Sequence, residues 1–209
     1  SPYTLRSGPS VSDLGGGLKS NVWAYNGEFP GPTMVARKGE MVKIQLQNLL
    51  TEDTITHWHG MIVDHHNDGQ PMQAISPGEH YDYEYVINQR AALNFYHPHP
   101  HMLTGKQVYL GQAGGFIIRD AEEDSLQLPS GKYEVPLILR DATLDSYNNL
   151  SYKPSSGGMF GKIPLVNGTR NPFLAVERAV YRFRILNGAN SRIFGLALSN
   201  GSNFKLIGN

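Results

Sequence analysis

The segment MVKIQLQ, residues 41–47, alternates apolar and polar side chains without a break. Val42, Ile44 and Leu46 fall on one side of an extended chain, and the polar residues between them fall on the other. This period of two predicts a half-buried β-strand, and YDYEYVI (81–87) repeats it. These two segments indicate a protein built on β-sheet.

Other short apolar runs, each bounded by turn residues, extend the same pattern. They predict strands at AGGFIIRD (113–120), YEVPLILRD (133–141), VYRFRILN (180–187) and NFKLIGN (203–209). Clusters of Gly, Pro and Asn separate them, and no window of ten or more residues has a helical period. We therefore expect an all-β chain, folded as an antiparallel sandwich or barrel with Greek-key connections.

The overall charge of the 209 residues is balanced, with 18 Lys and Arg against 18 Asp and Glu. A net charge of zero removes the electrostatic reason to bind nucleic acid or an anionic membrane, so we expect neither as a partner. No run of 18 apolar residues is present, and the start, SPYTLRSGPS, has no basic-then-apolar signal region.

The acidic and then Pro/Gly-containing stretch AEEDSLQLPSGK (121–132) lies between two strand-rich halves. We therefore predict a first domain over residues 1–124 and the beginning of a second over 125–209. The second half stops directly after a strand-like run, which would leave an open sheet edge. We expect this second domain to be incomplete.

Histidine is unevenly distributed, and cysteine is absent. All eight histidines lie between His57 and His101. The absence of cysteine excludes disulfides, thiolate zinc sites and iron–sulfur clusters within these residues. It also excludes a blue-copper centre here, because that centre needs a thiolate ligand.

Two His-X-His pairs, His57-Trp58-His59 and His97-Pro98-His99, are the strongest candidates for a site. On an extended chain, residues i and i+2 point to the same side about 6.5 to 7 Å apart. Two such pairs on neighbouring strands would bring four imidazoles together, a spacing that suits two or three metal ions. Imidazole ligands favour copper, zinc, nickel or iron. A single pair would more often be a packing or surface feature.

These motifs also carry a family resemblance. THWHG (56–60), YHPHPH (96–101) and GKQVYLGQAGGFIIRD (105–120) together resemble the first domain of multicopper oxidases, a family that includes laccases and the bacterial cuprous and bilirubin oxidases. Residues 26–48 resemble the opening strands of that domain, and residues 160–192 resemble the start of the second cupredoxin domain. The resemblance implies a cupredoxin-like Greek-key β-sandwich, with one complete domain followed by part of another.

The resemblance implies roles for individual residues in a trinuclear copper site. His57 resembles the ligand of the type 2 copper, and His59, His97 and His99 resemble ligands of the coupled type 3 pair. The segment HHNDGQPM (65–72) matches the stretch where the family places an acid, so Asp68 is the candidate catalytic proton donor. Asp68 is equally well explained as a turn residue in Asn-Asp-Gly.

The implied activity is the one-electron oxidation of a phenol, a pigment or a metal ion, coupled to reduction of dioxygen to water. The type 1 copper ligands would then lie outside this chain, in the remaining polypeptide of the oxidase with its C-terminal cupredoxin domain. We expect residues 1–209 alone to be inactive. A periplasmic or otherwise extracytoplasmic location is also implied, with the signal peptide absent from this chain.

Trp58 and the remaining four histidines are expected to lie outside the set of metal ligands. We expect Trp58 to pack in the core, because alternation turns it away from the histidine side. His101 could support the ligands from outside the first shell, whereas His65, His66 and His80 are expected to be exposed.

Two rival functions stay open. Some relatives keep the cupredoxin fold without the copper ligands and act as scaffold or assembly proteins of the cell envelope; all four expected histidines are present here. Copper nitrite reductases share the fold, but their first domain carries the blue-copper cysteine that this chain lacks.

Overall fold

The structure is a computed structural model that describes residues 1–17 and 19–208. Within these residues, the first 119 form two four-stranded sheets. The first sheet has the order β2-β1-β4-β6, with bounds Lys19–Tyr25, Tyr3–Asp13, Met41–Asn48 and His80–Val86. The second has the order β3-β8-β7-β5, with bounds Gly31–Arg37, Gly114–Arg119, Ala92–Pro98 and Thr56–His59.

The two sheets form a sandwich because each presents one apolar side to the other. On β4 the side that carries Ile44 and Leu46 is buried, and Ile44 pairs in register with Tyr83 of β6. Trp58 of β5 and Phe116 of β8 reach the same core from the second sheet. The expected β-sandwich is therefore confirmed for residues 1–119, which we call the sandwich region.

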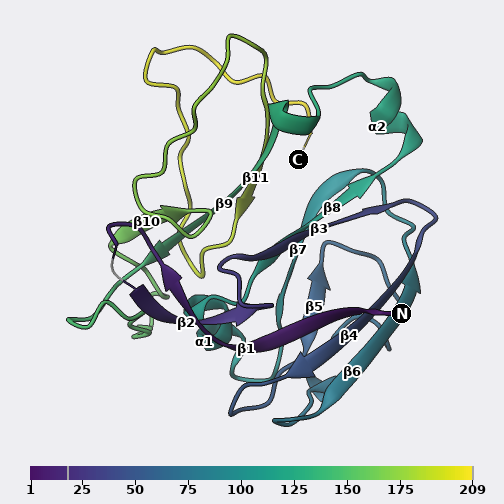
Figure 1. The fold of residues 1–209 in the computed structure, drawn as a ribbon, viewed down its shortest axis with the longest axis vertical. Coiled ribbons are helices and arrows are strands. Elements are labelled where there is room, and N and C mark those ends of the chain that lie inside the picture. Colours follow the sequence, from purple (N-terminus) through teal and green to yellow (C-terminus); the bar gives the residue numbers. More distant parts are fainter. Residues whose placement is uncertain (18, 209) are drawn as a thin grey trace.

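A three-stranded sheet with the order β10-β9-β11 follows, with bounds Ile163–Val166, Glu134–Ala142 and Arg182–Asn187. In Figure 1 these strands and the loops around them, coloured green to yellow, form a group beside the sandwich. We call residues 134–208 the second region. Between the two regions lie the short helix α2 (Ala121–Ser125) and the 3-10 turn η2 (Gly131–Tyr133). Helix α1 (Thr104–Leu110) connects β7 to β8, and the 3-10 turn η1 (Pro71–Gln73) precedes β6.

The sequence-based strand predictions at 41–47, 81–87, 113–120, 133–141 and 180–187 are confirmed within two residues at each end. The prediction at 203–209 is wrong for residues 203–208, which form no strand, and Asn209 lies outside the described residues. The expectation of purely antiparallel sheets is also wrong. β1 runs parallel to β4, β3 to β8, and β11 to β9. Alternation along one strand carries no information about the direction of its neighbour, so it does not distinguish a parallel pair from an antiparallel one.

Candidate metal centre

The pairing of β5 with β7 brings the two His-X-His segments side by side. The strands are antiparallel neighbours, and His57 lies directly opposite His97. Because side chains alternate along β5, His57 and His59 share one side, and Trp58 points into the core. There its ring meets Tyr83 edge to face at 5.0 Å, as expected for a packing residue.

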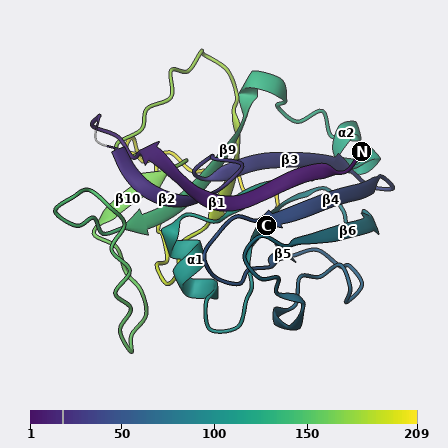
Figure 2. The same ribbon diagram turned by 60° about the horizontal axis from the view of Figure 1, so that its bottom comes forward.

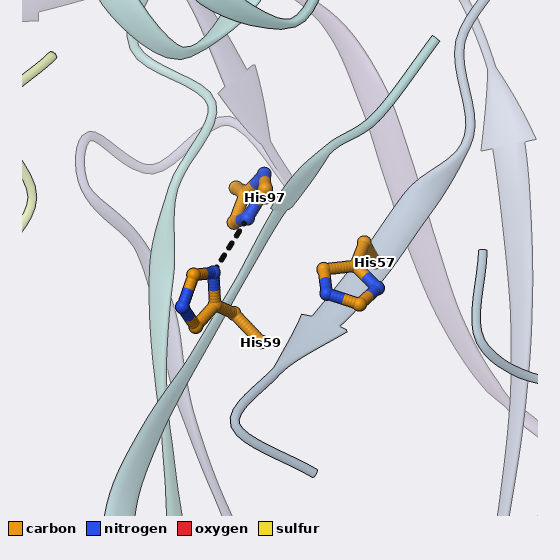
Figure 3. A group of neighbouring side chains, drawn as sticks. All are labelled: His57, His59 and His97. Atoms are coloured by element: carbon orange, nitrogen blue, oxygen red, sulfur yellow. Dashed lines mark hydrogen bonds between the residues drawn. The ribbon is translucent and has the colours of Figure 1, made fainter. Parts of the chain in front are cut away.

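Three of the histidines have the spacing of metal ligands. One ring nitrogen each from His57, His59 and His97 lie within 4.8 Å of one another. His59 Nδ1 is 3.2 Å from His97 Nε2 (Figure 3). Two nitrogens that bind one metal ion at about 2.0–2.1 Å in a tetrahedral arrangement lie about 3.3 Å apart, so this pair fits a shared ion. The ring of His99 adds a fourth imidazole, 5.1 Å from the ring of His57.

Backbone carbonyl groups orient two of these rings. His57 Nδ1 donates to the Asp68 carbonyl at 2.6 Å, and His97 Nδ1 donates to the Pro98 carbonyl at 2.8 Å. Each of these bonds leaves Nε2 as the free nitrogen, as is usual for metal-binding histidines. His99 Nδ1 is buried without a hydrogen-bond partner among residues 1–17 and 19–208.

Burial keeps the imidazoles of His59 and His97 neutral at pH 7. Burial lowers the pKa of His97 to about 4, although the Pro98 carbonyl acts in the opposite direction. Burial also lowers the pKa of His59, and the neighbouring rings of His57 and His99 lower it further. A neutral imidazole keeps a lone pair on one nitrogen, and this is the form that binds metal.

Asp68 lies beside this site. Its Oδ1 is 3.3 Å from His57 Nδ1, and its other carboxylate oxygen accepts a hydrogen bond from the Gln70 amide. Gly69 permits this position: it has a φ of +69°, and a Cβ there would lie 1.9 Å from the Thr56 carbonyl oxygen. The segment that follows β5 therefore packs directly against the first histidine pair.

The other four histidines are exposed. The expectation of exposure is confirmed for His65, His66 and His80. His101 is exposed as well, on the turn after β7, and a supporting role for it stays a prediction. Gln107 is a further polar residue near the site that is absent from the predicted set. Its buried side chain is hydrogen-bonded to Thr54, two residues before β5. No local motif marks it, because its partners lie more than 50 residues away.

A known protein family matches the part of the chain that contains both His-X-His pairs. Residues 10–123, more than half of the chain, match the profile of a family described as multicopper oxidase. The chain belongs to the multicopper oxidase family. The sandwich region accordingly has the cupredoxin-like fold expected from the sequence.

The relatives of this chain include proteins named as oxidases and a protein named for cell division. The multicopper oxidase mco of Staphylococcus aureus is 39% identical over 206 residues, covering 98% of this chain and 46% of the relative. The crystal structure of McoA multicopper oxidase from Aquifex aeolicus superposes with a TM-score of 0.84 at 39% identity, covering 90% of this chain and 43% of that one. Cell division protein FtsP of Escherichia coli is 35% identical over 194 residues, covering 91% of this chain and 41% of the relative.

This multicopper oxidase chain spans about half the length of the curated relatives that it matches. The family implies copper as the metal, and the four neighbouring imidazoles, with neutral His59 and His97, are donors that copper accepts. None of the described helices is long and apolar enough to cross a membrane.

Proposed function

We propose that this chain is the N-terminal part of an oxidase that takes single electrons from a small reducing substrate and reduces dioxygen to water. The observation that carries the proposal is the convergence of two His-X-His pairs on adjacent strands, with ring nitrogens 3.2 Å apart at the closest pair. The substrate class, a phenol, a pigment or a metal ion, follows from the family resemblance.

In this proposal the four histidines hold copper. His57 would bind the type 2 ion, and His59, His97 and His99 would bind the type 3 pair. Copper, when bound, would supply one-electron redox chemistry and the place where dioxygen reacts. The carbonyls of Asp68 and Pro98 keep the rings in one orientation and one tautomer, so that ring reorientation does not add to the barrier.

Asp68 is proposed to deliver protons to the reacting oxygen, since forming water from dioxygen consumes four of them. Its carboxylate lies 3.3 Å from the His57 ring and is half-buried, which supports a route from solvent to the site. General acid catalysis typically contributes at least about a hundredfold to a rate, so Asp68→Asn should lower oxygen uptake by about that factor. Copper content should stay unchanged.

Asp82→Asn is the matched control, because Asp82 is exposed on β6. Loss of copper from Asp68→Asn would show that the carboxylate positions His57 and would contradict proton delivery.

The rest of the machinery is proposed to lie in further polypeptide of the same oxidase. This chain has no cysteine, so a type 1 copper and its electron entry would need another part of the protein. We also propose that residues 1–124 form the first cupredoxin-like domain and that residues 125–209 begin the second. The extracytoplasmic location implied by the family is part of this proposal.

The test is to load the intact protein with copper and measure metal content, oxygen uptake and hydrogen peroxide release. We expect oxygen uptake with each suitable reductant and no peroxide, because four electrons reach each oxygen molecule. A protein that binds copper at the histidines but consumes no oxygen with phenols, pigments, Cu(I) or Mn(II) would contradict the oxidase.

One relative of this chain, FtsP, is named for cell division. This favours as a second candidate the scaffold or assembly protein of the cell envelope that keeps the cupredoxin fold without oxidase activity. Such a protein needs neither four imidazoles in one place nor carbonyl groups that orient two of them. A copper-free preparation with full stability and no measurable affinity for copper would favour this alternative.

A further inference from the structure

The side chain of Gln107, in the middle of α1, is completely buried and makes three hydrogen bonds. Its Oε1 accepts from Thr54 Oγ1 at 2.8 Å. Its Nε2 donates to the Asp53 carbonyl at 2.8 Å and to the Glu52 carboxylate at 3.1 Å. Both amide hydrogens and the amide oxygen are therefore used, so the side chain is fixed in one orientation.

These bonds join the two histidine segments at a distance from the metal site. Thr54 precedes His57 by three residues, and α1 begins five residues after His99. Helix α1 packs against β7 and β2, and it lies below β1 and β2 in Figure 2. Gln107 thus connects residues 52–54, which precede His57 and His59, to helix α1, which follows His97 and His99.

The Gln107 hydrogen bonds matter because the direct strand pairing between the two histidine segments, β5 with β7, is short. β5 has four residues and lies at the edge of its sheet, so only β7 supports it by ladder hydrogen bonds. The ladder ends at the Thr56–Pro98 pair, and proline has no N–H to extend it. Beyond it, His99 N donates to the Ile55 carbonyl at 2.8 Å, and the Gln107 bonds lie next along the same segment.

We infer that Gln107 is a positioning residue for the histidine site, and that it sets the separation between His57–His59 and His97–His99. The inference rests on the proposed copper site but concerns metal affinity and geometry rather than oxygen chemistry. Without the Gln107 amide, Thr54 and the Asp53 carbonyl lose buried partners, and the segment must move to find others. Because β5 pairs with only one strand, that movement would displace His57 and His59. The hydrogen bonds of Thr56 to Tyr83 and of Thr54 to Ile75 limit its size.

Gln112 provides a matched control in the same part of the molecule. It is also completely buried, and its amide donates to Ser7 Oγ on β1, away from both histidine segments. Gln107→Leu and Gln112→Leu therefore both remove a buried glutamine, but only the first should affect the metal site. Thr54→Val removes one of the three bonds with little change of shape, which gives a milder variant if Gln107→Leu does not fold.

The experiment measures Cu(II) affinity by chelator competition, the electron paramagnetic resonance spectrum of bound Cu(II) and the thermal unfolding midpoint, all in the intact protein. We expect Gln107→Leu to weaken Cu(II) binding about tenfold, at the lower end of the effect of removing an outer-shell partner, and to alter the copper hyperfine splitting. Thr54→Val should shift both in the same direction by less. Gln112→Leu should lower the unfolding midpoint while affinity and spectrum stay as in the wild type.

Equal affinities and spectra for the Gln107→Leu and Gln112→Leu variants would overturn the positioning role, even if the wild type reduces oxygen. Conversely, a wild type that binds Cu(II) but reduces no oxygen would contradict the oxidase and leave the affinity difference as a valid test. A wild type without affinity for Cu(II) would overturn both.

Discussion

The strands β4 and β11 have the same alternating pattern, but they bury opposite sides of it. On β4, Ile44 is 2% exposed and its polar neighbours face outward. On β11, Phe183 and Ile185 are 38% and 41% exposed, whereas Arg184 between them is 7% exposed. Alternation thus predicts that a strand has two different sides, but the layer that covers it decides which side is buried.

The reason for the difference lies in what each strand packs against. The second sheet of the sandwich covers the apolar side of β4 with aromatic and aliphatic side chains. Arg184 instead faces Glu123 of α2 and Glu134 of β9, and it donates to both carboxylates. Arg119 of β8 and Arg182 of β11 complete this cluster of buried charges.

The two regions are therefore stabilised in different ways. The sandwich region closes a core of its own and carries the histidines. The second region attaches to it through this charged cluster and through a shared apolar cluster, in which Leu14, Val22 and Tyr109 meet Ala142 and Leu165. It leaves apolar side chains of β11 exposed. If this comparison is correct, substitutions in the sandwich region should affect chemistry and core, and substitutions on β11 should act through the charged cluster.

The largest effect is expected for His97→Ala in the intact protein. The change removes a proposed ligand, and since losing an outer-shell partner alone costs about 10- to 100-fold, oxygen uptake should fall by more than about a hundredfold. Circular dichroism should show an unchanged fold. His80→Ala, at an exposed histidine of β6, is the control and should keep full activity. Equal activity of the two variants would exclude the assigned site.

The next effect concerns the contact between the regions. Glu134→Gln removes a buried carboxylate that pairs with Arg119 and Arg184, and it leaves Glu123 as their one acidic partner in the cluster. Removing one partner of a buried ion pair costs about 3–5 kcal/mol when the other is left unpaired, and since Glu123 remains we expect a loss at the lower end of that range in urea unfolding. Glu177→Gln, in an exposed pair with Lys132, should cost less than about 1 kcal/mol. Similar losses for both would show that the cluster does not join the regions.

This cluster marks what sequence analysis could not predict. Val42, Ile44 and Leu46 predict a strand because their pattern is local, and the two His-X-His pairs predict a shared site for the same reason. The partners of Glu134, by contrast, include Arg184, 50 residues further along the chain. The burial of Arg184 and of Gln107 depends on such distant contacts, so no local period reveals it.

A smaller, pH-dependent effect should follow from the same carboxylates. Burial alone raises the pKa of Glu134, but hydrogen bonds and charge attraction from Arg119 and Arg184 outweigh it and lower the pKa below its ordinary value of 4.5. Burial likewise raises the pKa of Glu123, but hydrogen bonds and charge attraction from Arg182 and Arg184 outweigh it and lower that pKa. Because both pKa values are lower in the folded state, these groups stabilise the fold above pH 4.5 and lose that contribution as the pH falls through the folded-state values.

Urea unfolding from pH 7 to pH 3 checks this expectation. The wild type should lose stability more steeply than Glu134→Gln, and the two curves should approach each other at the acid end. A stability difference that stays constant with pH would contradict the linkage to Glu134.

The smallest effect is expected for Ile185→Ala on the exposed side of β11. In residues 1–209, the change should alter the free energy of unfolding by no more than about 0.5 kcal/mol, as is usual at a surface position. Ile44→Ala, its counterpart on β4, removes a buried side chain and should cost about 2–5 kcal/mol. A cost for Ile185→Ala as large as that for Ile44→Ala would show that the apolar side of β11 is covered within these residues.

In the intact protein the same substitution tests the proposed further polypeptide, because covering Phe183 and Ile185 would raise the cost of Ile185→Ala toward the value for a core position. The difference between the two measurements therefore reports directly on what packs against β11.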